Sequence, residues 1–279
     1  MDQRLEMTCG IGELKRLLRT KYDFVCSIGP DCGCAGHLIK SRLRRASYPL
    51  DWLGTWPLSL TRVAEIVRDE FAGFLKLENI RSIPPPKPVQ TPDGVLDDTR
   101  HAWCGDDALH IVIPHDFPID RPIAEAYPEV RRKYDRRIAR FYRTIRSSKR
   151  VLMVYWTWRT HPTPDDILAA AGIFRAKFPE SRVDLLVMRH RDGAGMDVRE
   201  LSDGVVLMDA PIHPAGLNPA FGDIPFNCRL FGAIRLRGKR RALFREWLQR
   251  TAVKAKALFI FDHDKRRAYR QSKRKAKFT

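Results

Sequence analysis

Two side chains that lie far apart in this chain of 279 residues are the best suited to covalent chemistry. Cys32 follows the turn Ser27-Ile28-Gly29-Pro30-Asp31, which leads from an apolar run into a segment with helical spacing. In the first turn of a helix, free backbone amides and the helix dipole stabilise a thiolate. This position predicts a lowered pKa and a nucleophilic thiol. The alternative is a small buried cysteine beside a glycine turn.

A cysteine nucleophile needs a base, and His115 is the predicted base. It follows the short apolar run Leu109–Ile113, so its imidazole is expected near the end of a strand. An imidazole there can take the thiol proton and return it to a leaving group. Asp116 or Asp51 could orient the ring, as the third member of a catalytic triad does. The alternative is that His115 only hydrogen-bonds a loop.

Apolar runs and helical stripes alternate along the chain. Strands are predicted at Tyr22–Ile28, Leu109–Ile113, Val151–Trp156, Val183–Met188 and Val205–Met208. Helices are predicted after the capping residues Asp31, Ser59 and Thr163, over Val130–Ile145, and over Leu243–Val253. The alternation predicts an α/β fold, with a layered mixed or parallel sheet flanked by helices. In such sheets ligands gather where strands end and helices begin.

Three other segments carry local predictions. The stripe from Leu60 to Leu75 predicts one long helix. The proline-rich segment Ile83–Pro92 is expected to be a loop and a candidate lid, because prolines lack the amide hydrogen that helices and central strands use. The segment from Pro211 to Asn227 is expected to be irregular.

The composition is strongly basic, with a formal net charge of +18 and with 44% hydrophobic residues, which excludes wholesale disorder. Basic residues concentrate in Arg131–Arg150, Arg229–Arg250 and Lys265–Thr279. No apolar run approaches the roughly 20 residues that cross a bilayer, and no secretory segment is evident. We therefore expect a cytoplasmic protein with reduced cysteines, one α/β domain over residues 1–264, and a disordered basic tail over residues 265–279 that contacts polyanions without specificity.

Several motifs over residues 24–154 resemble a bacterial family of domains of unknown function, described as papain-like cysteine peptidases. The pattern is a strand, Gly-x-x-Cys, a helix, an Arg-x-Ser-x-Pro-Phe-Asp-Trp-like loop, a His-Asp-Phe motif and a basic helix. The matching residues are Cys26-Ser27-Ile28-Gly29, Cys32, Ala35, Leu38, Leu43-Arg44, Ser47-Tyr48-Pro49-Leu50-Asp51-Trp52, His115-Asp116-Phe117, Lys133-Tyr134, Arg136-Arg137 and Arg140-Phe141. Leu50 departs from the pattern, because the loop usually has Phe there.

The resemblance implies a cysteine peptidase, or a related thiol-dependent hydrolase or acyltransferase, with Cys32 as nucleophile and His115 as base. Two observations favour a different reaction. The alternating strands and helices fit poorly with the antiparallel sheet of papain. The basic helix, with Arg136, Arg137 and Arg140, would suit a phosphate or another anion. One alternative is therefore a transferase that uses a phosphorylated, nucleotide-sugar-like donor, and another is a non-enzymatic polyanion-binding protein.

No metal or cofactor is predicted. Cys26, Cys32, Cys34 and His37 do not have a standard zinc spacing, and Cys26 is expected to face the core. The sequence has no Walker loop, no G-x-G-x-x-G and no H-E-x-x-H motif. The expected substrate is a peptide, an acyl compound or a phosphorylated compound.

Overall fold

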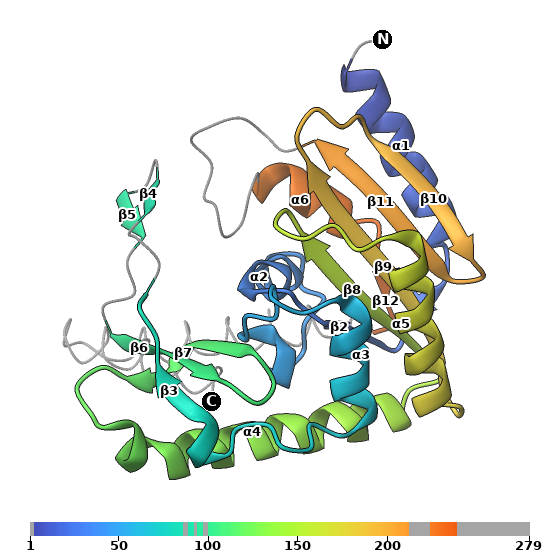
Figure 1. Cartoon of the computed structure of the whole chain (residues 1–279). Coiled ribbons are helices and arrows are strands. Elements are labelled where there is room, and N and C mark those ends of the chain that lie inside the picture. Colours follow the sequence, from blue (N-terminus) through green and yellow to red (C-terminus); the bar gives the residue numbers. More distant parts are fainter. Residues whose placement is uncertain (1–2, 86–88, 92–93, 97–99, 212–223, 239–279) are drawn as a thin grey trace, which may run out of the picture. The chain divides into compact units, whose positions relative to one another are not determined.

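A computed structural model describes residues 3–85, 89–91, 94–96, 100–211 and 224–238 (Figure 1). The chain divides into two units, Met1–Arg237 and Gly238–Thr279, and the fold described below is that of the first unit. The predicted helix over Leu243–Val253 and the basic tail over residues 265–279 lie outside the described residues.

The unit is built on a five-stranded sheet with the order β10-β11-β9-β8-β2. Four strands are parallel and β10 is antiparallel to β11. The bounds are β2 Phe24–Ser27, β8 Arg150–Thr157, β9 Arg182–Arg191, β10 Asp197–Ser202 and β11 Val205–Pro211. The predicted α/β class with a mixed sheet flanked by helices is confirmed.

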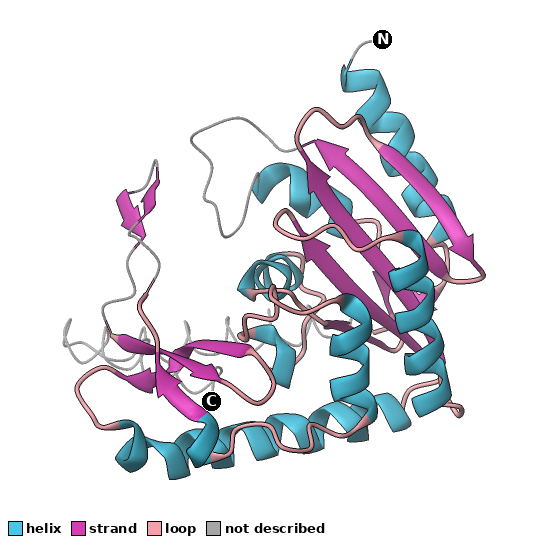
Figure 2. Cartoon of the chain, in the orientation of Figure 1, coloured by secondary structure: helices cyan, strands magenta, loops and turns pink. Residues whose placement is uncertain are grey.

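Helices cover both faces of this sheet, as Figure 2 shows. One face packs against α1, α2 and α6, and the other against α3, α4 and α5. The bounds are α1 Gln3–Leu17, α2 Cys32–Lys40, α3 Leu60–Arg68, α4 Ile123–Arg146, α5 Pro164–Lys177 and α6 Ile224–Phe231. Successive residues of a strand point to opposite faces, so Leu185 and Leu186 of β9 enter different cores. Because both faces are buried, the parallel strands are continuous apolar runs.

A smaller antiparallel sheet has the order β3-β6-β7, and α4 packs against it. Its strands are β3 Ile80–Ser82, β6 His101–Asp106 and β7 Ile111–Pro118. Two short pairs complete the strands: β1 Lys21–Tyr22 with β12 Arg235–Leu236, and β4 Val89–Thr91 with β5 Gly94–Leu96. Two 3-10 turns, η1 Pro49–Asp51 and η2 Leu77–Asn79, lie between these elements.

The predicted caps form. Asp31 accepts a hydrogen bond from the backbone N–H of Gly33, Ser59 from that of Arg62, and Thr163 from that of Asp166. Each satisfies a backbone donor that the first turn of a helix leaves open. These three helices therefore begin where the sequence predicts.

Four local predictions are wrong. Helix α3 ends at Arg68, and the chain turns there because Phe71 and Leu75 have φ values of 60° and 56°. Strand β7 continues through Pro114 and beyond His115. In the expected loop Ile83–Pro92, residues Val89–Thr91 pair as β4 with β5 in a two-stranded hairpin, while residues 83–85 form no helix or strand. Helix α6 occupies part of the segment expected to be irregular, and strands β6 and β10 were not predicted.

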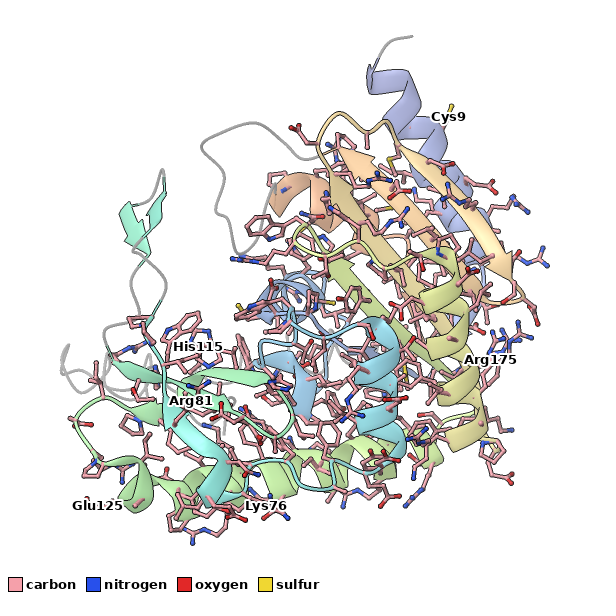
Figure 3. All side chains as sticks on the ribbon, in the orientation of Figure 1. Cys9, Lys76, Arg81, His115, Glu125 and Arg175 are labelled. Atoms are coloured by element: carbon pink, nitrogen blue, oxygen red, sulfur yellow. The ribbon has the colours of Figure 1, made fainter. Side chains whose placement is uncertain are left out.

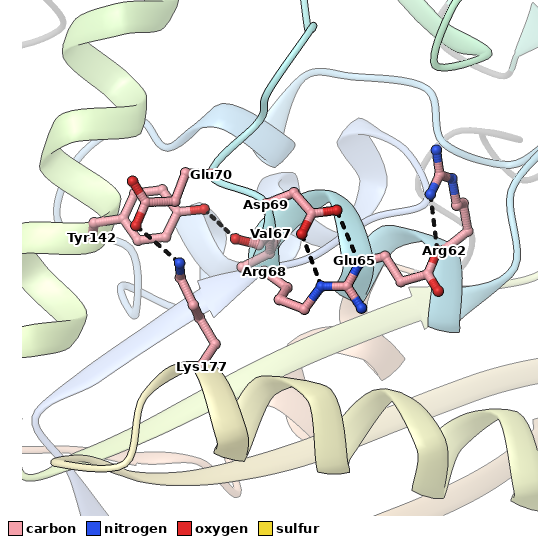
Figure 4. A network of polar contacts seen from close by, with 8 residues as sticks. All are labelled: Arg62, Glu65, Val67, Arg68, Asp69, Glu70, Tyr142 and Lys177. Atoms are coloured by element: carbon pink, nitrogen blue, oxygen red, sulfur yellow. Dashed lines mark hydrogen bonds and ion pairs between the residues drawn. The ribbon is translucent and has the colours of Figure 1, made fainter.

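Polar contacts join α3, α4 and α5 near the end of α3 (Figure 4). Glu70 accepts from Lys177 of α5 at 2.9 Å, and from Arg146 of α4 at 3.2 Å. Tyr142 of α4 donates its buried hydroxyl hydrogen to the carbonyl of Val67. The Glu70–Arg146 ion pair is exposed and the Glu70–Lys177 pair is partly exposed, so each contributes little to stability. The tyrosine hydrogen bond is buried, and its loss would leave a polar group unsatisfied.

Among the helices of the described residues, none is both long and apolar enough to cross a membrane.

The two-sided core makes a stability prediction. Leu185→Ala and Leu186→Ala should each lower the free energy of unfolding by about 2–5 kcal/mol, because each opens a cavity on its own side of the sheet. The control Leu168→Ala, at a side chain 37% exposed on α5, should cost clearly less. Urea unfolding of the three variants measures these losses. A small loss for only one of the two adjacent leucines would contradict burial of both faces.

Candidate functional site

Cys32 is the first residue of α2 and lies just beyond the C-terminal end of β2. The carboxylate of Asp31 accepts the Gly33 N–H at 2.8 Å and thereby holds the turn. Cys34 points into the core, where its thiol donates to the carbonyl of Val154 at 3.4 Å. Cys32 is half-buried, unlike the fully buried Cys26 and Cys34. It is therefore the least buried of the three cysteines in this region.

The pKa of Cys32 is raised to about 12, so the predicted lowering is wrong. Burial of the thiol is the largest cause, followed by the charge of Asp31, and these outweigh the lowering effects of the Cys32 N–H and of Arg159. The amides at the start of a helix lower the pKa of a thiol, but burial raises it, and here the effect of burial is larger. At neutral pH the Cys32 side chain is a thiol, and a base is needed to make it a nucleophile.

His115 lies within β7, one of the two edge strands of the small sheet (Figure 3). The β6–β7 register shifts between Ala102 and Cys104, so residues 114–116 lie opposite Trp103 alone. An irregular pairing of this kind tolerates Pro114, which has no N–H for a regular ladder. The half-buried imidazole of His115 meets the rings of Trp52 and His101 edge to face, each with a centroid distance of 6.3 Å.

One short segment, residues 52–56, contacts both the turn before Cys32 and the strand that carries His115. Thr55 donates its backbone N–H to the carbonyl of Pro30 at 2.6 Å. Gly54 and Val112 of β7 exchange two backbone hydrogen bonds, at 2.7 and 2.9 Å. Together with the contact between Trp52 and His115, these bonds fix the helix start and the strand relative to the same loop.

Close approach of this loop also explains a glycine in the turn. Gly29 has a φ of +114°, and a Cβ there would come within 2.6 Å of Thr55 Oγ1. A side chain at position 29 would strain the backbone and push the loop away.

Asp51 holds the loop from within the protein. Its fully buried carboxylate accepts from Arg44 Nε and from the N–H of Tyr48, both at 2.7 Å. The Arg44 guanidinium also donates to Ser47 Oγ, and it lies over the Trp52 ring at 5.4 Å. Burial raises the pKa of Asp51 even though Arg44 opposes the rise. Asp51 therefore positions the loop that contacts His115.

Asp116 lies among side chains of α4. It accepts the hydroxyl hydrogen of Tyr134, forms an ion pair with Lys133, and lies 3.7 Å from Arg137. His115 contacts the rings of Trp52 and His101, so its side chain has different neighbours from that of Asp116. That either Asp51 or Asp116 orients the imidazole stays a prediction.

The three arginines of the predicted anion site have different surroundings. Arg140 donates to the carbonyl of Ser47 at 3.0 Å. Arg137 is largely buried and lies over the ring of Tyr134 at 5.0 Å. Arg136 is exposed. Two of the three thus pack against the protein, and binding of a phosphorylated donor by this set stays a prediction.

Sequence reasoning missed His190, which lies near the C-terminal end of β9. The indole N–H of Trp156 donates to His190 Nε2 at 2.9 Å and to Asn227 Oδ1 at 3.1 Å, and His190 Nδ1 lies 3.2 Å from the carbonyl of Pro211. An indole can only donate, so these contacts assign a neutral imidazole with its hydrogen on Nδ1. The signal available in the sequence was its place beyond an apolar strand.

Sequence reasoning also missed Arg159, which follows β8. Its guanidinium carbon lies 4.4 Å from the centre of the Trp158 ring and 5.7 Å from that of Trp56. Arg159 Nε is 3.9 Å from Asp31 Oδ2, so the guanidinium lies beside the Cys32 turn. In the sequence, the available signal was Trp158 next to Arg159 after a predicted strand. Trp56 gave no such signal, because it lies 102 residues before Trp158.

The residues that the structure describes contain no group of three or more His, Cys, Asp or Glu side chains that could hold a metal ion.

The fold and these contacts define an α/β protein of three layers, with a half-buried thiol at a helix start and an imidazole on a strand that shares its loop. The family model "Putative papain-like cysteine peptidase (DUF1796)" matches residues 23–168, and the chain belongs to this family. Over 133 residues the chain is 28% identical to an uncharacterized protein of Acanthamoeba polyphaga mimivirus. That match covers 46% of this chain and 59% of the viral protein. No solved structure matches the chain significantly.

The raised pKa of Cys32 makes a prediction about reactivity. Its alkylation by iodoacetamide should accelerate roughly tenfold per pH unit from neutral pH toward about pH 10, because the thiolate fraction grows by that factor below the pKa. Asp31→Asn keeps a capping side chain and removes a charge that raises the pKa. This variant should therefore react faster at each pH.

Peptide mass mapping of the alkylated chain measures both effects. Asp165→Asn, at an exposed position in the first turn of α5, is the control and should not change the rate at Cys32. A rate that levels off near neutral pH would contradict the raised pKa.

The buried ion pair of the loop makes a stability prediction. The side chains of Arg44 and Asp51 are 10% and 0% exposed, so Arg44→Ala should lower the free energy of unfolding by about 3–5 kcal/mol by leaving a buried carboxylate uncompensated. Arg62→Ala breaks the more exposed pair with Glu65, drawn in Figure 4, and should cost less than about 1 kcal/mol. Denaturant unfolding compares the two variants. Equal losses would show that Asp51 does not depend on Arg44.

Proposed function

We propose that this protein is a cysteine-dependent hydrolase that acts on acyl substrates such as peptides, with Cys32 as the nucleophile and His115 as the base. One observation carries the proposal: residues 52–56 bond to both the turn that presents Cys32 and the strand that presents His115. Membership of the cysteine peptidase-like family supports the same assignment.

The surroundings of Cys32 define what the base must do. Because burial and Asp31 keep the thiol protonated at neutral pH, the proton must leave as the sulfur attacks. In the proposed reaction the Sγ of Cys32 bonds to the acyl carbon, His115 accepts the thiol proton, and it then protonates the departing group. Water next attacks the thioester, His115 takes a proton from that water, and the thiol regains its hydrogen as the acid product leaves.

The pair would act at the edge of the parallel sheet where ligands of α/β proteins bind. Cys32 follows the C-terminal end of β2, and residues 158–160 follow that of the neighbouring strand β8. The sheet also separates this protein from papain, whose sheet is antiparallel. The proposal therefore rests on thiol chemistry and assigns no papain-like arrangement of strands.

The proposal predicts that p-nitrophenyl acetate acetylates Cys32 and releases p-nitrophenolate. Cys32→Ala should abolish this acetylation, as measured by peptide mass mapping and by the absorbance of the released phenolate. His115→Ala should slow it by about 10²–10⁴-fold at neutral pH, because a positioned general base contributes that factor. The loss should shrink as the pH rises, since hydroxide then removes the thiol proton.

Two other histidines serve as controls. His110 is exposed in the turn between β6 and β7, so His110→Ala should leave the rate unchanged. His101 touches the ring of His115, and His101→Ala tests whether the neighbouring imidazole is the base instead. An unchanged rate in His115→Ala, or a full loss in His101→Ala alone, would overturn the assignment of His115.

A further inference from the structure

A guanidinium beside Cys32 is held in place by aromatic rings and keeps its hydrogen-bond donors. The turn after β8 fixes the backbone of Arg159, because Thr157 Oγ1 accepts the N–H groups of Arg159 and Thr160 at 3.1 and 3.0 Å. The side chain then lies over Trp158 and within cation–π range of Trp56. Such stacking restricts the guanidinium without using its N–H groups.

Asp31 is the nearest carboxylate to this guanidinium, and it leaves these donors open. The distance of 3.9 Å from Arg159 Nε to Asp31 Oδ2 makes an ion pair but exceeds hydrogen-bond length. Among the described residues, no acceptor takes a hydrogen bond from the Arg159 guanidinium, whose side chain is 47% exposed. The indole Nε1 of Trp158, beneath it, is buried and also has no hydrogen-bond partner in that part of the chain.

Three other arginines of this region use donors within the protein, whereas the buried Arg137 Nη1 has no hydrogen-bond partner among the described residues. Arg44 bonds to Asp51 and Ser47, and Arg140 bonds to the carbonyl of Ser47. Farther along the sheet edge, Arg189 makes two bonds to the buried carboxylate of Asp209. Arg159 differs from all three, because its fork of donors faces partly into solvent next to the half-buried thiol.

Resting on the function proposed above, we infer that Arg159 is a specificity-determining residue that binds a carboxylate of the substrate next to the acyl group attacked by Cys32. A guanidinium binds a carboxylate through two parallel N–H···O bonds. The adjacent Trp56 and Trp158 rings provide apolar walls for the carbon chain that bears the carboxylate. The substrate class is therefore an acidic peptide or a related acyl compound with a nearby carboxylate.

Asp31 places a negative charge beside the proposed subsite. Asp31 is a buried residue in the same turn as Cys32, and its carboxylate lies near the proposed subsite. Attraction to Arg159 and repulsion from Asp31 both grow with the charge of the ligand, so the choice of a carboxylate rests on the acyl substrate of the proposed function. Asp31 also limits how tightly any anion binds.

Two alkylating reagents of nearly equal shape test this subsite on the full chain. Iodoacetate carries a carboxylate where iodoacetamide carries a neutral amide, and with either one the thiolate of Cys32 displaces iodide to form a thioether. The ratio of the two rate constants cancels the thiolate fraction, so a change in the pKa of Cys32 does not affect it. Peptide mass mapping follows Cys32 and the exposed Cys9 in the same sample.

The iodoacetate-to-iodoacetamide rate ratio at Cys32 should exceed that of free N-acetylcysteine by on the order of tenfold. Arg159→Gln should remove this preference, and Arg159→Lys should keep part of it. Arg62→Gln, the same substitution at an arginine of α3, should leave the ratio unchanged, as should the measurement at Cys9 in every variant. A ratio at Cys32 no higher than that of N-acetylcysteine, or one unaffected by Arg159→Gln, would overturn the inference.

Protection of the unaltered chain from iodoacetamide identifies the source of the carboxylate. Aspartate with blocked amino and α-carboxyl groups represents a side chain, and N-acetylglycine represents a chain terminus. The compound that protects Cys32 better shows whether the bound carboxylate belongs to a side chain or to a chain terminus. Protection by neither, or better protection by inorganic phosphate, would overturn the carboxylate assignment. His115→Ala should leave the rate ratio intact, so failure of this subsite and failure of the proposed hydrolysis are distinguishable.

Discussion

A buried carboxylate and its arginine determine where the reactive parts of this protein lie. Removing Asp51 from water is costly unless charged and polar donors surround it. Arg44 Nε and the Tyr48 N–H both bond to Oδ2, while Oδ1 has no hydrogen-bond partner among the described residues. The contact fixes the start of a loop whose next residues bond to Pro30 on one side and Val112 on the other. The ion pair between Asp51 and Arg44 thus stabilises a loop that contacts both the start of α2, beside the five-stranded sheet, and strand β7 of the small sheet.

The regular part of the fold could be predicted from the sequence, because the local pattern of each element, an apolar run or a capped helical stripe, agrees with its burial in the fold. The apolar run of β8 is buried on both faces, and Asp31, Ser59 and Thr163 cap helices at positions where a polar residue precedes a helical stripe. Strand β10 is different, because its mostly polar sequence carries no apolar signal and it pairs only at the sheet edge.

The errors near the site have physical causes that a local pattern does not contain. Pro114 predicts a strand end, but the shifted register opposite Trp103 accepts it and carries His115 inside the strand. The position of Cys32 predicts a lowered pKa, but the depth of burial and the charge of Asp31 decide its direction. The stacking of Arg159 on Trp158 and Trp56 depends on a loop and a strand end meeting in space.

The contact between Trp156 and His190 has a consequence for how the fold uses its histidines. A catalytic base must lose and regain a proton in every turnover, and it needs a lone pair that is open to the reactant. On His190 that lone pair already receives the indole hydrogen of Trp156, and the other ring nitrogen faces the carbonyl of Pro211. This imidazole therefore joins β8, β9 and β11 as a structural crosslink, and its location at the ligand-binding edge of a parallel sheet is no evidence of catalysis.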